Sequence, residues 1–541
     1  MQRKWWTLAA VCIGVFMLLL DVTIVNVALP DIGRAFSASL SDLQWTIDAY
    51  ALTLAALLLT AGSLADRFGR RLMFAVGTAM FTVGSLLCGL AQTSLFLILA
   101  RAGQGVGGAI MFATSLALLA DAFRGRDRGV AFGVFGAVTG VAVAVGPVLG
   151  GVLTSGLSWR WIFFVNLPVG VVAVAITLLT VAESRNPHAG RVDWFGLVTF
   201  SGALGALVYG LIRSSTDGWS SAQVAGCLIG AAVLLVAFGV AEAVQTQPMF
   251  DLTLLRKPTF DGGLFAAFGL SASLFSMFAY LVLYMQSVLG LSAVATGIRF
   301  LVLSGAIFVA AAIAGRLTER VPAKLLIGPG FVAIGAGLLL MGGLTVDSGW
   351  THFIPGFIVA GVGAGFVNVP LASTAVGVVA PERAGMASGI NTTFRQVGIA
   401  TGVAGLGSIF SAQMRDTVTV GLAGTPVAQQ AGHIAQAVSG GGIQAAVAAA
   451  PPSARAAIGV AAHAGFVAGL NEVLLVAAVT AFVAAGLSLV LIRQRDFVVR
   501  GPAGGGDGGG RGPGGDGQPA PASAAIPAIP AIPAIPAAPT A

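Results

Sequence analysis

The chain carries about fourteen long apolar segments joined by short loops, and this feature limits its fold more than any other. A helix that spans a bilayer needs about 20 consecutive residues, most of them apolar. The segments therefore predict an all-α membrane protein. We expect fourteen spanning helices, at 7–30, 45–65, 72–92, 94–120, 129–155, 161–182, 193–213, 221–243, 262–288, 296–318, 323–343, 351–380, 385–411 and 466–492.

The placement of charge predicts how the chain crosses the membrane. Charged residues make up only 9% of the 541 residues, against about 25% in a soluble domain. Basic residues of membrane proteins gather in cytoplasmic loops. With both termini in the cytoplasm, 20 of the 28 Lys and Arg lie on the cytoplasmic side and 5 outside. The sequence thus predicts a multi-pass plasma-membrane protein with cytoplasmic N- and C-termini.

Several classes of function are excluded by what the sequence lacks. Its three Cys lie within apolar runs and do not form a disulfide framework, and its four His have no metal-ligand spacing. It has no glycine–lysine pattern of a nucleotide-binding P-loop. Its basic residues form no single face that would bind nucleic acid. We therefore expect no enzyme activity, cofactor, metal or nucleic-acid partner, and a lipid bilayer as the surroundings.

An internal repeat predicts the domain organisation. The loop sequence at 62–67, which continues to Arg71, recurs at 315–320, which continues to Lys324. Repeated halves with a site between them near the bilayer midplane are common in transporters. We predict an N-terminal six-helix bundle over 1–192, two inserted helices and a linker over 193–261, and a second six-helix bundle over 262–496.

Two further segments stand apart by composition. Residues 412–465 are rich in Ala and Gly, which predicts a long external loop with at most a short surface helix. Residues 497–541 are rich in Gly and Pro and end in an Ala-Ile-Pro repeat. Such a composition cannot bury a core, so we expect a disordered cytoplasmic tail.

Asp21 and Arg101 stand out among the charged residues inside predicted spans. Asp21 is in the middle of the first span, where a carboxylate costs about 3 kcal/mol even on a lenient scale. It is either a structural partner of a neighbouring Arg or hydroxyl, or a group that exchanges protons. Arg101 in the fourth span must pair with an acid or carbonyls, or face a wet cavity. The nearest acids in this half are Asp21 and Asp48, and a purely structural ion pair is the alternative.

Five motifs, in order along the chain, resemble the 14-spanning drug:proton antiporters of the major facilitator superfamily. The resemblance covers residue 1 to about residue 495. The motifs are the first-helix motif at 20–30, the loop motif at 62–71, the fourth-helix motif at 101–105, the glycine-rich fifth-helix motif at 140–151 and the segment Trp159 to Pro168.

This resemblance implies roles for particular residues. It implies proton coupling by Asp21, Asp48 and Arg101, although Asp48 could instead be a water-facing residue at the mouth. The loop motif implies a conformational latch, formed by Gly62, Asp66, Arg67, Gly69, Arg70 and Arg71. We expect its two glycines to permit a close turn, and Asp66 to cap the next helix and to pair with an Arg across the two halves.

The remaining motifs point to a flexible helix and a cavity. The fifth-helix motif implies a bent helix with little side-chain bulk, at Gly140, Gly146, Pro147, Gly150 and Gly151. Polar residues inside spans are candidates for the cavity, namely Asn26, Gln104, Asn368, Asn391, Arg395 and Gln396. Some of the 32 Phe are also expected to line it, without any pattern to indicate which.

The function implied by the resemblance is proton-coupled export by alternating access, with amphipathic drugs or antibiotics and protons as partners. One alternative is a dedicated exporter of one endogenous metabolite, lipid or siderophore. Another is a membrane sensor or scaffold, against which the intramembrane Asp21 and Arg101 argue. The tenth span carries Arg299 and no acid, which argues against strong transport of dicationic drugs. No pattern indicates an oligomeric state.

Overall fold

The computed structural model describes residues 3–123, 126–185, 193–245, 248, 250–318, 320–379 and 384–497. These residues form helices and loops only. The helices of the first part are α1 (Arg3–Phe36), α2 (Leu40–Phe68), α3 (Arg70–Gly89), α4 (Ser94–Ala122), α5 (Arg126–Gly156), α6 (Trp161–Phe164), α7 (Asn166–Thr180), α8 (Trp194–Asp217) and α9 (Ala222–Val244).

The second part begins with the short helix η1 (Leu252–Arg256). Its longer elements are α10 (Pro258–Leu270), η2 (Ser271–Phe275), α11 (Ser276–Leu283), η3 (Tyr284–Val288), α12 (Ala293–Leu317), α13 (Ala323–Met341), α14 (Phe353–Gly377), α15 (Ala384–Gly421), α16 (Ala431–Ser439), α17 (Ile443–Ala449) and α18 (Arg455–Leu491). Single turns occur at η4 (Trp350–His352), η6 (Ala428–Gln430) and η7 (Gln494–Asp496).

Local sequence signals explain where several of these helices begin. Ser39 precedes α2 and accepts a hydrogen bond from the backbone N–H of Asp42, whose carboxylate accepts one from the Ser39 N–H in return. This reciprocal capping satisfies two backbone donors that the first helical turn leaves free. Thr93 caps α4 and Ser292 caps α12 in the simpler, one-sided way. The apolar spans therefore start at polar caps.

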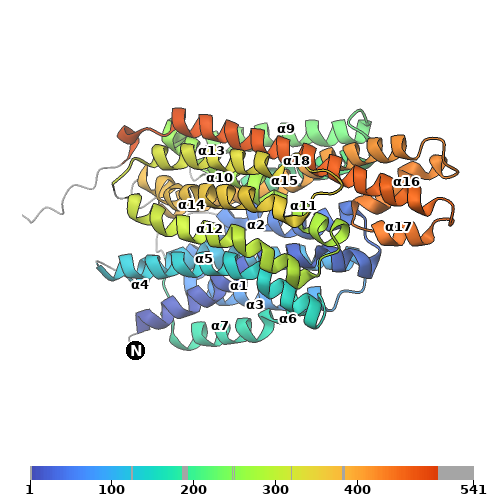
Figure 1. Ribbon diagram of the computed structural model, residues 1–541. Coiled ribbons are helices and arrows are strands. Elements are labelled where there is room, and N and C mark those ends of the chain that lie inside the picture. The colour runs from blue at the N-terminus through green and yellow to red at the C-terminus, as the bar shows by residue number, and fades with distance from the viewer. Residues whose placement is uncertain are drawn as a thin grey trace, which may run out of the picture. The chain divides into compact units, whose positions relative to one another are not determined.

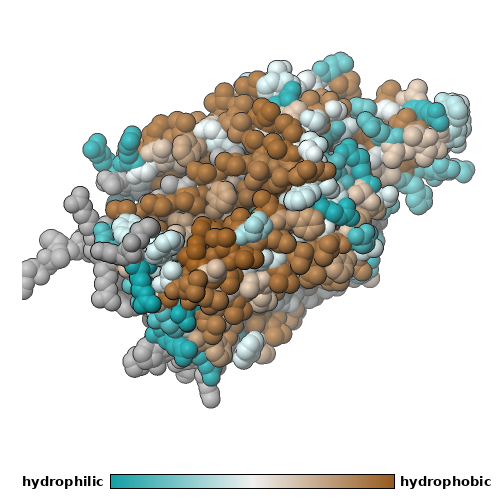
Figure 2. Space-filling model, turned by 90° about the horizontal axis from the view of Figure 1, so that it is seen from below, coloured by the Kyte–Doolittle hydropathy of each residue, from teal (hydrophilic) through white to brown (hydrophobic). Residues whose placement is uncertain are grey.

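Length and surface character fit the helices to a membrane. Of the described helices, 13 are long and apolar enough to cross one, and α5 makes 14 if its two parts, bent by 41°, count as one span. Figure 2 shows an apolar band over the surface, with hydrophilic residues gathered on either side of it. Large apolar side chains such as Leu179 and Val236 are exposed on the surface. This surface is the kind that lipid covers.

The two six-helix bundles pack their helices in the same order. In the first, α3 packs on α4, α2 on α4, α1 on α5, and α3 on α7. The second repeats these pairs as α13 on α14, α12 on α14, α10 on α15, and α13 on α18. The bundles meet where α5 packs on α12 and α2 packs on α15. The two inserted helices pack on each other, and α8 also contacts both α2 and α15. The predicted fold class is therefore confirmed.

The segment 412–465 is more ordered than the sequence predicts. Instead of a long loop, α15 continues to Gly421, α18 begins at Arg455, and α16 and α17 lie between them at the end of the bundle opposite the N-terminus (Figure 1). Val418, Val438 and Ile458 in this segment are buried in the main apolar core. Ala-rich sequence has high helix propensity, and these side chains supply the docking surface. We call residues 412–465 the helical cap.

Candidate functional site

Asp21 and Arg101 form a buried ion pair between α1 and α4. An Nη1 N–H of Arg101 donates to Asp21 Oδ2 at 2.5 Å. The Asp21 side chain is 0% exposed and that of Arg101 is 2% exposed. The second predicted acid, Asp48, is not the partner of Arg101. Of the two acids that the sequence offered as partners of Arg101, the structure therefore shows Asp21 in that position.

Three amide and hydroxyl side chains complete the surroundings of Asp21. Gln104 lies one turn after Arg101 on the same face of α4. Its Nε2 donates to Asp21 Oδ1 at 2.9 Å and to Ser85 Oγ at 2.7 Å, while its Oε1 accepts from Arg101 at 2.7 Å. Asn166 Nδ2, at the start of α7, donates to Ser85 Oγ at 3.2 Å and to Asp21 Oδ1 at 3.5 Å. Both charges are therefore embedded in a polar network.

The sequence did not single out Ser85 and Asn166 as site residues. Asn166 stands in an otherwise apolar stretch, Trp161 to Pro168, and that isolation is a signal that could have identified it. Ser85 offers no comparable signal, because a lone serine in a spanning helix commonly bonds its own backbone. Gln104 was expected in the cavity, whereas the structure places it in this network.

The guanidinium of Arg101 is also held from α2. Its Nε donates to the backbone oxygen of Thr46 at 3.1 Å, and its Cζ lies 4.3 Å from the centre of the Tyr50 ring. A cation over an aromatic face is attracted by the ring quadrupole. The network consequently joins five helices of the first bundle, α1, α2, α3, α4 and α7.

Asp48 is the second buried acid, and its surroundings are the opposite of those of Asp21. Its side chain is 0% exposed, and neither carboxylate oxygen has a hydrogen-bond partner among the described residues. It is therefore not a water-facing residue at the mouth. One turn earlier on α2, Gln44 Nε2 donates to Val403 O at 3.0 Å, so this face of α2 is turned toward the second bundle.

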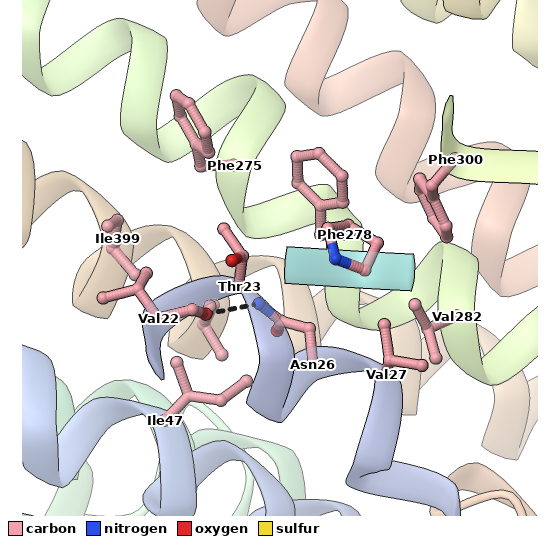
Figure 3. Close-up of a pocket in the computed structure, with 12 residues that line it drawn as sticks. Val22, Thr23, Asn26, Val27, Ile47, Phe275, Phe278, Val282, Phe300 and Ile399 are labelled. Carbon is pink, nitrogen blue, oxygen red and sulfur yellow. Dashed lines mark hydrogen bonds between the residues drawn. The ribbon is translucent and has the colours of Figure 1, made fainter. Parts of the chain in front are cut away.

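A cavity lies between the two bundles, where α1, α2 and α5 face η2, α11, α12 and α15. Its empty space, including the part open to solvent, is about 550 Å³. In Figure 3 the rings of Phe275, Phe278 and Phe300 line one side, and Asn26 and Val27 of α1 lie on the other. The remaining lining is aliphatic apart from Thr23 and Pro147.

Of the six candidate cavity residues, the structure places only Asn26 in this lining. Asn391 Nδ2 instead donates to Gly263 O at 3.3 Å and joins α15 to α10. Arg395 and Gln396 lie on α15 one turn before the lining residue Ile399, and Asn368 is half-buried on α14. Polarity alone did not identify the lining, because buried amides also serve to join helices.

Neither contact predicted for Asp66, the cap of the next helix or the ion pair across the two halves, is found among the described residues. Arg70 donates to Asp66 Oδ1 from Nε at 3.0 Å and from Nη2 at 2.8 Å, within the same loop. No ion pair of Asp66 with the second bundle occurs within the described part of the chain. The cap of α3 is Glu183, which follows α7: its carboxylate accepts from the backbone N–H groups of Arg71 and Leu72 at 3.0 and 3.2 Å.

The two glycines of this loop have different environments. Gly69 has φ +111°, and a Cβ there would lie 2.6 Å from Glu183 Oε1, so the turn requires glycine. Gly62 lies inside α2, with nothing within 4 Å of its Cβ position. It does not form part of the turn. Arg67 is exposed, and Arg71 lies 3.8 Å from Glu183.

The fifth-helix motif brings α5 close to two neighbours. A Cβ at Gly146 would lie 1.9 Å from Thr23 Oγ1, and one at Gly150 would lie 2.9 Å from Ile24 Cγ1, both on α1. A Cβ at Gly151 would lie 2.5 Å from Ala293 O at the start of α12. Gly140 has ordinary space, with its nearest neighbour at 4.0 Å. The bend between Ala142 and Val145 lies just before Pro147, whose ring crowds the preceding turn.

Comparison with known proteins identifies relatives over most of the chain. A family model described as Major Facilitator Superfamily matches residues 11–403. Multidrug resistance protein Stp of Mycobacterium tuberculosis is 36% identical over 76% of this chain and 77% of its own. Puromycin resistance protein pur8 of Streptomyces alboniger is 38% identical over 75% and 82%, and the tetracenomycin C resistance and export protein of Streptomyces glaucescens is 32% identical over 90% and 91%.

Solved structures show the same fold at low sequence identity. A bacterial homologue of the human lysosomal transporter Spinster, in an inward-facing and unoccupied conformation, matches with a TM-score of 0.54 and 19% identity, over 92% of this chain and 99% of that one. The human organic anion transporter MFSD10 matches with a TM-score of 0.55 and 13% identity, over 90% and 99%.

Proposed function

Since this chain belongs to the Major Facilitator Superfamily, we propose that it is a proton-coupled antiporter that exports amphipathic drugs or antibiotics by alternating access. Members of this family are membrane transporters and not enzymes. Relatives named for multidrug and puromycin resistance support a drug as the cargo. The relative named as a resistance and export protein for tetracenomycin C supports the second candidate, dedicated export of one compound.

The observation that carries proton coupling is the burial of Asp21 with Arg101. A buried charge pair is costly to assemble, and packed apolar side chains of similar volume often stabilise a protein equally well. A transporter that needed only rigidity at this point would not require a buried ion pair. Protonation of Asp21 removes its charge and leaves Arg101 without its counter-charge. The network that joins α1 to α4 and α7 would then rearrange.

Helix α1 connects the proton site to the substrate site. Asp21 faces the interior of the first bundle, whereas its chain neighbours Val22 and Thr23 line the cavity. Proton and substrate therefore occupy different faces of one helix. Movement of α1 on protonation would alter the cavity without direct competition for the carboxylate, and the small face of α5 along Gly146 and Gly150 provides a close surface for that movement.

Asp48 is the second proton carrier in this proposal. A charged carboxylate buried without a donor or counter-charge is costly, so the neutral acid suits its surroundings in this state. Asp48 lies one turn from Gln44, which donates across the bundle interface to Val403 O. Ionisation of Asp48 would favour separation of the two bundles at that interface, because water could then hydrate the charged carboxylate.

Opening toward the outside would separate contacts at the end of the bundle that carries the helical cap. There Gln286 Nε2 of η3 donates to Val27 O of α1 at 2.9 Å, and Gln44 of α2 contacts α15. The helical cap adds a backbone contact: a Cβ at Gly440 would lie 3.0 Å from Ala38 O in the α1–α2 loop. These contacts join the two bundles and would separate in each cycle.

Proteoliposomes that contain only this protein test the proposal. An imposed proton gradient should drive accumulation of a fluorescent amphipathic dye, and a protonophore should stop it. Each charge moved through 100 mV yields about 2.3 kcal/mol, enough for roughly a 50-fold gradient of a neutral substrate. Dye addition should also move protons, which a pH indicator trapped in the lumen reports. Accumulation that is indifferent to the protonophore, or that needs ATP, contradicts antiport.

A further inference from the structure

The cavity between the bundles has a distinctive chemistry. Among the described residues, none of the side chains that line it is ionisable, and the polar ones are Asn26 and Thr23. We propose that this cavity selects an uncharged, planar aromatic molecule that donates a hydrogen bond to the amide oxygen of Asn26. The inference rests on the proposed export function and names the substrate class for it.

The aromatic side chains that line one wall belong to a row of stacked rings that extends beyond the cavity. Phe275 and Phe278 stack with 27° between their planes, Phe278 and Phe300 lie 5.2 Å apart at 33°, and Phe300 and Phe357 stack at 28°. Phe357 stacks in turn on Phe353 at 24°. Offset stacking of nearly parallel rings is a favoured aromatic arrangement. A further planar ring in the cavity would join this stack (Figure 3).

The opposite wall offers a hydrogen-bond acceptor. Asn26 Nδ2 donates to Val22 O at 3.0 Å within α1. This bond fixes the amide and leaves Oδ1 without a donor among the described residues. The hydroxyl of Thr23 is donated to backbone oxygens of the same helix, with Leu20 O at 3.0 Å. Both side chains therefore offer an acceptor oxygen to the cavity, and a bound molecule that donates a hydrogen bond would satisfy Asn26 Oδ1.

Charged molecules are disfavoured by the position of the nearby acids. Asp21 is fully buried and already bound by Arg101 and Gln104. Asp48 follows the lining residue Ile47 but is itself 0% exposed and absent from the lining. A cation in the cavity would meet ring faces, which in Phe give a modest attraction, and the neutral oxygens of Asn26 and Thr23, but no carboxylate among the described lining residues. An anion would meet two acceptor oxygens and, among the described lining residues, only the second Nδ2 hydrogen of Asn26 as a donor. Neither would recover its cost of desolvation.

The shape of the cavity points to the same class. Its empty space of about 550 Å³ includes the part open to solvent. It lies between a row of rings on one side and α1 on the other. A flat molecule, thin in one direction, is the shape that such a space accepts with least separation of the bundles.

A matched series of tricyclic probes tests the inference by equilibrium binding. Acridone is neutral, planar and carries one N–H donor; 10-methylacridone lacks the donor; 10-methylacridinium carries a positive charge on the same ring system. Binding is measured by equilibrium dialysis against the purified full-length protein in lipid nanodiscs, with empty nanodiscs to correct for partition into lipid. We expect acridone to bind about fivefold more tightly than 10-methylacridone, as one hydrogen bond between neutral groups predicts. The acridinium should bind at least about tenfold more weakly than acridone.

Variants assign the selectivity to the named side chains. Asn26→Leu should remove the difference between acridone and 10-methylacridone, and Phe278→Ala should weaken both. Asn26→Asp should favour the acridinium. Phe265→Ala is the matched control, since Phe265 is 46% exposed on the outer surface of α10, and it should change nothing. Equal or tighter binding of the acridinium by the wild-type protein, binding of none of the probes, or an unchanged donor preference in Asn26→Leu each overturns the inference.

The binding assay needs no proton gradient, so its failure is distinguishable from failure of the export proposal. If gradient-driven dye transport occurs without this selectivity, the substrate class is wrong and antiport stands. If the selectivity is found but transport ignores the gradient, the cavity assignment stands and the coupling proposal is wrong.

Discussion

Arg101 reaches from α4 to Asp21 on α1 and donates a hydrogen bond of 2.5 Å where both side chains are excluded from solvent. Gln104 accepts a hydrogen bond from Arg101 and donates one to Asp21, so the three side chains form one hydrogen-bonded network. In a low-dielectric interior such a pair is strongly attractive only while both groups are charged. Proton uptake at Asp21 is therefore the smallest chemical change that would alter the packing of α1 on α4.

Substitution of Asp21 tests the coupling directly. Asp21→Asn should abolish gradient-driven efflux, because the amide cannot exchange a proton, while the amount of protein in the membrane stays near wild type. Everted vesicles report the efflux. Asp31→Asn is the matched control, since Asp31 pairs with Arg34 at the more exposed end of the same helix, and it should retain activity. Full efflux by Asp21→Asn would show that the proton is carried elsewhere.

Substitution of Arg101 should act through Asp21, whose buried charge loses its partner. Arg101→Ala leaves Asp21 buried and unpaired, which costs about 3–5 kcal/mol, so the thermal unfolding midpoint in detergent should fall markedly. Arg101→Lys should lose less but not recover activity, because one ammonium cannot reach Asp21, Gln104 and Thr46 O in the guanidinium geometry. The double variant Arg101→Ala with Asp21→Asn should be more stable than Arg101→Ala alone.

The control for Arg101 is Arg34→Ala, which breaks an ion pair whose arginine is 63% exposed. It should cost at most about 1 kcal/mol. Normal transport and an unchanged unfolding midpoint in Arg101→Ala would refute the pairing argument.

Replacement of each of the two glycines of the loop motif by alanine should change the stability of the protein in opposite directions. Gly69→Ala places a Cβ 2.6 Å from Glu183 Oε1 at a backbone angle of φ +111°, and it should destabilise by roughly 1–3 kcal/mol. Gly62→Ala adds a methyl group in open space inside a helix, where Ala is favoured over Gly by about 1 kcal/mol. Unfolding midpoints of the two variants in one detergent decide the matter. A destabilised Gly62→Ala together with a neutral Gly69→Ala would contradict the assignment.

Removal of residues 501–541 should leave transport nearly unchanged. The segment follows the last spanning helix and lies outside the described residues, and its Gly- and Pro-rich composition cannot bury a core. The chain just before it is held at Thr259, whose hydroxyl donates to Asp496 Oδ2 at 2.7 Å. Efflux should be compared at equal membrane levels. Loss of efflux in the truncated protein would indicate a partner for the tail.

Much of the architecture follows from the sequence because spanning helices leave a strong linear signal. About 20 apolar residues between polar caps specify a helix without reference to its neighbours, and the predicted spans agree with the helices. The helical cap is the exception. Its Ala-rich segments are too short to stand as helices in water on their own, and packing of residues such as Val438 and Ile458 into the core stabilises them.

The need of Asp21 and Arg101 for polar partners could be predicted from the sequence, because a charge in an apolar span is costly wherever the span packs. Only the tertiary structure decided that these two residues pair with each other and that the carboxylate of Asp48 has no hydrogen-bond partner among the described residues. It also decided that Glu183 caps α3 and that a stack of Phe rings lies across the cavity from Asn26. A linear pattern records the face and depth of a side chain on its own helix. Which side chain on another helix it meets depends on the rotation and register of two packed helices, and these are set by contacts between residues far apart in the chain.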